Sequence, residues 1–311
     1  MSQRIFTILV FSCFVIFSGK SASSQPVQQE KKVEMQTAAA INQRFRDCRN
    51  CPEMIVVPAG EFMMGENPHS SPKFESSRPD DLVVFRVMPT EAKPYHKVSI
   101  PTPFAVGRYP VTFDEWDECV SEGGCRGYQP VASPDEKHLF PVTDVNWDDV
   151  ESYINWIAKK TGKKYRLLTE AEWEYIARAG SSAYYYWGDA MEDGRINCCG
   201  EHPIEKMTKV GALPPNAFGV YDTLGYIWQW TEDCWHATYD RAPTDGSSWE
   251  VDGDCKLRVM RGGDYQSPSH IASLSDRNFA PIAYRWYSVG FRVARTIDDA
   301  STNVDASHGS E

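Results

Sequence analysis

Three helix-start signals lie close together in the middle of the chain, and no further helical periodicity follows Gly180. Each is a capping box, in which two side chains reciprocally bond the first backbone N–H groups of a helix. The boxes are Thr112/Glu115, Asn146/Asp149 and Thr169/Glu172. They predict a helix over 113–120, a longer one ending before Gly162 and a third stopped by Gly180. From there to residue 295, short aromatic runs alternate with turns. This order predicts an α+β fold with little regular secondary structure.

Short strands are also expected before the first helix. Residues 54–57 are apolar and β-branched, and Pro58 to Gly60 end the run. Residues 61–65 are expected to form the hairpin partner of this strand. Residues 98–106 predict a further pair of strands, interrupted by prolines.

The N-terminus resembles an export signal. Arg4 precedes an apolar run over 5–17, which at about 13 residues is too short to span a bilayer as a helix. Ala22 and Ser24 are small enough to permit cleavage before Gln25. The alternatives are an uncleaved anchor and a lipoprotein processed at Cys13, although the apolar run continues past that cysteine. A signal peptide over 1–24 predicts a periplasmic or secreted protein with no membrane span after cleavage.

The cysteines support that compartment. Of nine, Cys13 is lost with the signal, and the remaining even number predicts disulfides in an exported chain. The expected pairs are Cys48/Cys51, Cys119/Cys125 and Cys234/Cys255. Cys48 and Cys51 also have metal-site spacing, but one such pair supplies only two ligands. The remaining connectivity is left open.

Charge limits the partners. The chain carries 43 acidic and 32 basic residues, a net charge of −11, which becomes −13 when Arg4 and Lys20 leave with the signal. Nucleic-acid binding normally needs a basic face, so we expect no nucleic-acid partner. An acidic protein favours cationic or neutral ligands.

The domain boundaries follow from composition. We expect a linker with the Cys48/Cys51 segment over 25–52, one domain over 53–297, and a disordered, acidic, serine-rich tail over 298–311.

Eight ordered blocks resemble the formylglycine-generating enzyme (sulfatase-modifying factor) domain family. They are 54–65 (MIVVPAGEFMMG), 109–112 (YPVT), 141–147 (PVTDVNW), 165–175 (YRLLTEAEWEY), 216–222 (NAFGVYD), 225–230 (GYIWQW), 258–263 (RVMRGG) and 290–295 (GFRVAR). The resemblance implies a single compact α+β domain related to C-type lectins. It also implies that the tryptophans of these blocks belong to the core.

The same resemblance argues against the family's best-known reaction. Its oxidases convert a sulfatase cysteine to formylglycine with oxygen and copper(I), which two soft thiolates hold. In the family these cysteines are the fourth and ninth residues after the Arg-Gly-Gly motif. Here those positions are Ser267 and Ala272, so we expect no copper cofactor. Two other activities fit poorly: the histidines lack the pattern of an iron-dependent sulfoxide synthase, and no nucleophile elbow surrounds Ser267 for hydrolysis with His270 and Asp264.

Calcium is the metal that the resemblance still implies. Asn197, the carbonyl of Cys198 and Glu205 are the candidate ligands, and oxygen donors suit this hard cation. Asn197 could equally cap a turn. A second family site lies in 225–230, where Tyr226 and Gln229 replace Asn and Glu, and we expect it to be weak or empty.

Residues 264–289 depart most from the family and combine aromatic with small polar side chains, as adaptable binding surfaces do. The alternative is drift in an exposed loop. The candidate groove residues are Asp264, Tyr265, Ser267, His270, Tyr284, Trp286 and Tyr287.

Three functions follow from these features. The leading hypothesis is an exported binding or accessory module for a protein, peptide or small-molecule ligand. The alternatives are an oxidase of the same superfamily acting on a peptide, sulfatase or siderophore, and a cell-envelope scaffold.

Overall fold

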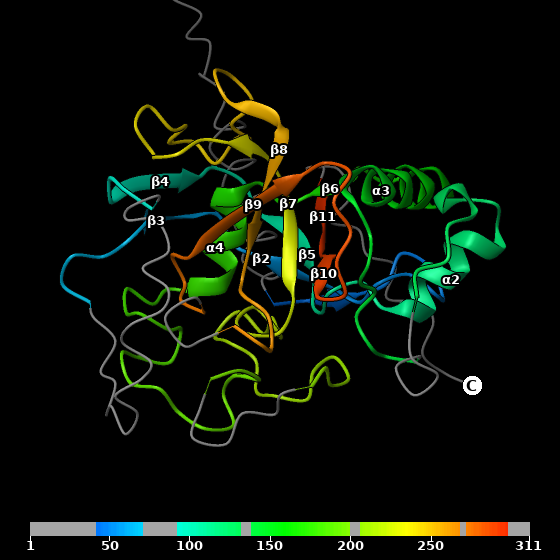
Figure 1. Cartoon of the computed structure of the whole chain (residues 1–311), viewed down its shortest axis with the longest axis horizontal. Helices are drawn as coiled ribbons and strands as arrows, with labels where there is room; N and C mark the ends of the chain where they lie inside the picture. Colours follow the sequence, from blue (N-terminus) through cyan, green and yellow to red (C-terminus); the bar gives the residue numbers. More distant parts are fainter. Residues whose placement is uncertain (1–41, 71–91, 132–137, 200–205, 268–271, 298–311) are drawn as a thin grey trace, which may run out of the picture.

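The structure is a computed structural model that describes residues 42–70, 92–131, 138–199, 206–267 and 272–297 (Figure 1). The predicted signal peptide and the predicted C-terminal tail lie outside these residues. Among the described helices, none is long and apolar enough to cross a membrane.

The three predicted helices form at their predicted capping boxes. They are α2 (Phe113–Ser121), α3 (Trp147–Thr161) and α4 (Glu170–Arg178). In each box the side chain of the N-cap residue accepts a hydrogen bond from the backbone N–H of the third helical residue. The side chain of that third residue accepts in turn from the backbone N–H of the N-cap residue. Gly162 ends α3 in the left-handed conformation. Ala179 takes that role in α4, so the expected stop at Gly180 is one residue late. A short 3₁₀ turn, η2 (Cys125–Gly127), follows α2.

A five-stranded antiparallel sheet spans the molecule in the order β1-β2-β5-β11-β6. Its strands are β1 (Arg44–Phe45), β2 (Met54–Val57), β5 (Phe104–Gly107), β11 (Val293–Thr296) and β6 (Tyr165–Leu167). The sheet therefore joins the first and last described segments of the chain. The part of the expected linker that is described, 42–52, contributes β1.

The predicted hairpin between 54–57 and 61–65 does not form. β2 pairs instead with β1 and β5, while β3 (Gly60–Met64) pairs with β4 (His96–Ile100) in a separate two-stranded sheet. Every residue of β2 is buried, so both faces of this strand are covered, and its two edges pair with β1 and β5. β3 alternates in exposure, as a strand with one solvent-facing side does.

The third sheet has the order β10-β7-β8-β9 and includes part of the predicted binding segment 264–289. Its strands are β10 (Val289–Phe291), β7 (Trp228–Trp235), β8 (Asp254–Arg261) and β9 (Arg277–Pro281). β10 runs parallel to β7, and the other pairs are antiparallel. In Figure 1 this sheet occupies the centre, with α4 on one side and α2 and α3 together on the other.

Aromatic side chains fill the core. Trp116 stacks on Tyr153 with ring centroids 5.8 Å apart, and Phe291 meets both rings edge-on. Trp173 and Trp230 are also buried. The described part of the chain is thus a mixed α+β domain with three α-helices and many short strands, as predicted.

Four disulfide bonds connect the described cysteines: Cys48–Cys51, Cys119–Cys125, Cys198–Cys199 and Cys234–Cys255. Three are the predicted pairs. The Cys198–Cys199 bond was missed because adjacent cysteines enclose no loop, and a loop was the signal used for two of the others.

The caps allow a matched test of local stability. Thr112 and Thr169 cap α2 and α4 alike, but Thr169 also donates a 2.9 Å hydrogen bond to the carbonyl of Gly246. We expect Thr112→Ala to lower the free energy of unfolding by about 1 kcal/mol. Thr169→Ala should cost about 2 kcal/mol, because a buried carbonyl also loses its donor. Urea denaturation measures both, and equal losses would contradict the added role of Thr169.

Candidate functional site

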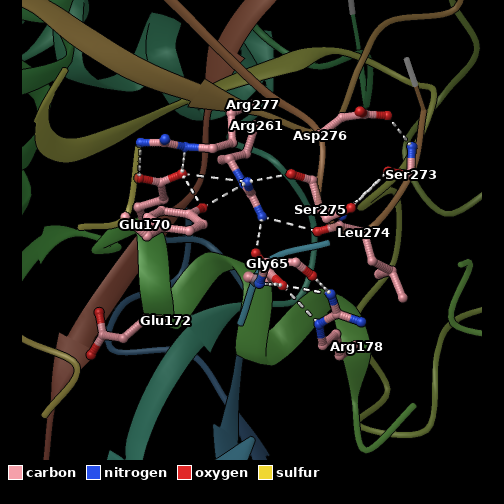
Figure 2. A network of polar contacts seen from close by, with 12 residues as sticks. Gly65, Glu170, Glu172, Arg178, Arg261, Ser273, Leu274, Ser275, Asp276 and Arg277 are labelled. Carbon is pink, nitrogen blue, oxygen red and sulfur yellow. Dashed lines mark hydrogen bonds and ion pairs between the residues drawn. The ribbon is translucent and has the colours of Figure 1, made fainter. Parts of the chain in front are cut away.

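A buried guanidinium lies at the base of the candidate site. Arg261 ends β8 immediately before the Gly262–Gly263 pair and is fully buried. It forms ion pairs with Glu170 and Glu174, both on α4. Its terminal N–H groups also donate to the carbonyls of Leu274 (2.9 Å) and Ser275 (3.2 Å), while its Nε has no hydrogen-bond partner among the described residues. Figure 2 shows this single side chain joining the helix to the loop at 274–275.

Two further arginines extend the network. Arg277, at the start of β9, contacts both carboxylate oxygens of Glu170, at 2.6 and 2.9 Å. Arg178 contacts Glu174 at 2.6 Å and donates to the carbonyl of Gly65 (Figure 2). Paired, hydrogen-bonded charges of this kind are the form in which charges tolerate burial.

The pKa values of two neighbouring acidic groups shift in opposite directions, down for Glu170 and up for Asp233. Burial alone would raise the pKa of Glu170, but the guanidiniums of Arg277 and Arg261 outweigh it and lower that pKa below its usual value. Asp233 on β7 has no basic partner among the described residues. Its oxygens accept from the backbone N–H groups of Glu170 and Trp249. Burial, assisted by the charge of Glu170, raises the pKa of Asp233 to about 7.

The glycine pair leads the chain closely past its neighbours. Gly262 has a φ of +108°, and a Cβ placed there would lie 2.9 Å from the carbonyl oxygen of Thr223. Its own carbonyl accepts from the N–H of Gly225. Two residues later Asp264 bridges to Tyr226. A residue without a side chain is therefore required at 262.

The two family copper positions are occupied by side chains that cannot act as thiolate ligands. Ser267 is 9% exposed, and its hydroxyl donates to the carboxylate of Asp264 at 2.8 Å. Ala272 is fully buried. The hydroxyl of Ser267 is hydrogen-bonded to a carboxylate, and the side chain of Ala272 is a methyl group. Neither is a soft donor of the kind that copper(I) prefers. The structure therefore does not fit the copper ion that the family resemblance implies.

The predicted groove residues partly converge. Tyr284, Trp286 and Tyr287 are 36%, 45% and 44% exposed and contact one another, and Tyr265 lies 6.4 Å from Tyr287 between ring centroids. Asp264 and Ser267 lie below the surface. The predicted groove residue His270 is outside the described residues.

The candidate calcium ligands differ in which of their oxygen atoms are available. Asn197 is 1% exposed, its amide N–H donates to Thr208, and its Oδ1 has no partner in the described structure. An oxygen left in this state fits a hard cation. The sulfur of Cys198 is in a disulfide, so only its carbonyl remains available, and Glu205 lies outside the described residues.

The second family calcium block is built differently. Gln229 is fully buried, and its Oε1 accepts from Trp173 and from Arg292, each at 3.2 Å. Its amide donates to the carbonyl of Asp222. Tyr226 is also buried, and its hydroxyl donates to a backbone carbonyl at 2.6 Å. Both side chains act as internal connectors and do not fit a calcium site.

Sequence reasoning missed the arginine network. Arg261 appeared only as part of the RVMRGG block, and Glu170 and Glu174 only as part of YRLLTEAEWEY. The available signal was the number of charged residues inside otherwise apolar, aromatic blocks.

Comparison with known proteins places this site in a family. Residues 38–297 match the model of the sulfatase-modifying factor enzyme 1-like domain. The chain belongs to this family.

Similar proteins include some that are named formylglycine-generating enzymes and some that are named inactive. The mouse formylglycine-generating enzyme is 33% identical over 138 residues, which cover 40% of this chain and 35% of that enzyme. The bovine inactive Cα-formylglycine-generating enzyme 2 is 36% identical, over 40% of this chain and 44% of that protein. These matches thus span less than half of either relative.

A solved structure matches more completely. The structure of PvdO from Pseudomonas aeruginosa is 35% identical, with a TM-score of 0.67, over 82% of this chain and 98% of that one. The similarity therefore extends through nearly the whole of that fold.

The raised pKa of Asp233 predicts a pH effect. In the folded state this carboxyl holds its proton to about pH 7, whereas in the unfolded chain it releases it near its ordinary value of about 4. The wild type should therefore lose this contribution to stability as pH rises between those values. Asp233→Asn stays neutral, so its stability relative to wild type should increase from pH 4 to pH 8.

Urea denaturation across that range measures the effect, with the exposed Asp240→Asn as the matched control. Parallel pH curves for wild type and Asp233→Asn would contradict the assignment.

Proposed function

We propose that this chain is an exported binding or accessory module of the sulfatase-modifying factor family that lacks copper-dependent oxidase chemistry. The observation that carries the proposal is the pair Ser267 and Ala272 at the family's thiolate positions. Both are integrated into the fold, one through Asp264 and the other within the core. No thiolate is available there to hold copper(I).

The binding role is supported by residues 264–289. Exposed aromatic side chains cluster in this segment on a frame fixed by Arg261 and its carboxylates. Rigid aromatics on a preorganised scaffold lose little entropy when they bind a protein, peptide or small molecule. The relatives named inactive are consistent with family members that have lost catalysis.

Export is supported by the disulfides. Four disulfides in one domain are typical of oxidising compartments, such as the periplasm or the extracellular space. We further propose one structural calcium ion, held by Asn197, the carbonyl of Cys198 and Glu205.

The second candidate is an oxidase of the same superfamily acting on a peptide, a sulfatase or a siderophore. It is favoured by the relatives named as formylglycine-generating enzymes, and it requires a metal site that does not use Ser267 or Ala272.

Metal content and oxygen consumption distinguish the two candidates. We expect purified protein, incubated with copper(I) or iron(II) and then desalted, to retain well under one equivalent of either metal. We also expect no oxygen uptake with a cysteine-containing sulfatase peptide. Stoichiometric metal together with oxygen uptake would establish the oxidase and exclude the binding module.

Calcium removal tests the proposed ion. Chelation with EGTA should lower the melting temperature, because an ion bound only to the folded state stabilises it by mass action. Asn197→Ala should melt at a lower temperature and lose its response to calcium. An unchanged melting temperature of the wild type on chelation would contradict the site.

A further inference from the structure

The exposed aromatic side chains form one cluster. Among the described residues, the large aromatic side chains that reach 36% exposure or more are Tyr284, Trp286 and Tyr287. Tyr284 and Trp286 have nearly parallel rings with centroids 6.0 Å apart, and Trp286 and Tyr287 lie 4.9 Å apart. We call these three residues the aromatic strip. The face of each aromatic ring carries negative π-electron density.

A buried carboxylate without a basic partner lies beside the strip. Asp264 is 8% exposed, and its oxygens accept from the hydroxyls of Ser267 (2.8 Å) and Ser288 (2.6 Å) and from the N–H of Gln266. In the described structure no Lys, Arg or His contacts it. Asp149 and Glu170, which are equally buried, each pair with two arginines. Among the described residues, Asp264 therefore differs from these two carboxylates in having no arginine, lysine or histidine paired with it.

Several contacts connect this carboxylate to the strip. Burial raises the pKa of Tyr284, and Tyr287 and Asp264 raise it further. The hydroxyl of Tyr287 donates to Gln266, two residues from Asp264. Ser288, which bonds Asp264, directly follows Tyr287 in the chain.

The arginine within the strip's segment is already paired. Arg285 lies within the strip's segment, but its guanidinium bonds Asp149 at 2.7 Å and stacks on Tyr128. Arg126 bonds the other oxygen of Asp149. Asp144 accepts from the hydroxyl of Tyr128. Both guanidiniums are therefore paired with Asp149, and neither is paired with Asp264.

We propose that the aromatic strip and Asp264 form a binding site for an organic cation, an ammonium or guanidinium group. Rings attract a cation through their quadrupole, and an uncompensated carboxylate nearby strengthens that attraction. The inference rests on the proposed binding function and names its ligand class. The cation comes either from a small free amine or from a lysine or arginine side chain of a peptide.

Choline and its uncharged analogue 3,3-dimethylbutan-1-ol test the charge directly, because the two differ mainly in a nitrogen replaced by carbon. The titration is followed by NMR shifts of the Trp286 indole N–H and the backbone amides of 284–288 in the full chain. We expect choline to bind about tenfold more tightly than the alcohol. N-acetyl-lysine methylamide and a Gly-Lys-Gly peptide form the other arms, and tighter binding of the peptide identifies a peptide side chain as the source.

Two variants separate charge from stacking. Asp264→Asn should weaken choline binding about fivefold and leave the alcohol unchanged. Trp286→Leu should weaken both ligands, since it removes a ring. Asp117→Asn, an exposed carboxylate on α2, is the matched control and should change neither. Thermal melts confirm that each variant is folded.

The outcomes distinguish this inference from the proposed function. Equal binding of choline and the alcohol at the strip would overturn the cation site but leave a binding face. Shifts confined to other parts of the chain, or no shifts with any probe, would overturn the cation site as well. The proposed function is judged separately by metal content and oxygen uptake.

Discussion

The burial of Arg261 is the constraint on which the rest of this structure depends. A buried guanidinium needs partners within the protein, and the terminal N–H groups of Arg261 find theirs on α4 and in the loop at 274–275. Because these segments are far apart in sequence, the network fixes their relative positions. The Gly262–Gly263 turn that begins at Arg261 is thereby held in place, and with it Asp264.

This constraint separates the frame of the family from its chemistry. The frame requires Arg261, its carboxylates on α4 and a glycine at 262, and all of these are present. The reaction requires thiolates at 267 and 272, and these are replaced by a serine bound to Asp264 and by a buried alanine. The buried residues of 264–289, such as Leu274 and Arg277, belong to this frame, whereas Tyr284, Trp286 and Tyr287 of the same segment are exposed and form its aromatic surface.

Local features of the sequence predicted local structure well. Capping boxes act within a single turn, so Thr112, Asn146 and Thr169 marked the helix starts correctly. Pairing between strands depends on burial, which is a property of the whole fold. For that reason 54–57 was assigned the wrong partner, although its uninterrupted apolar character already indicated a strand buried on both faces.

The sequence by itself determined the family, the helix starts, three of the four disulfides and the absence of cysteine at 267 and 272. Each of these depends on residue identity or on short spacing along the chain. The tertiary structure decided which charges are compensated. Asp149, Glu170 and Asp264 look alike in sequence, but only the folded chain brings arginines to the first two and places the third beside exposed rings. That difference arises from long-range packing, which no local pattern records.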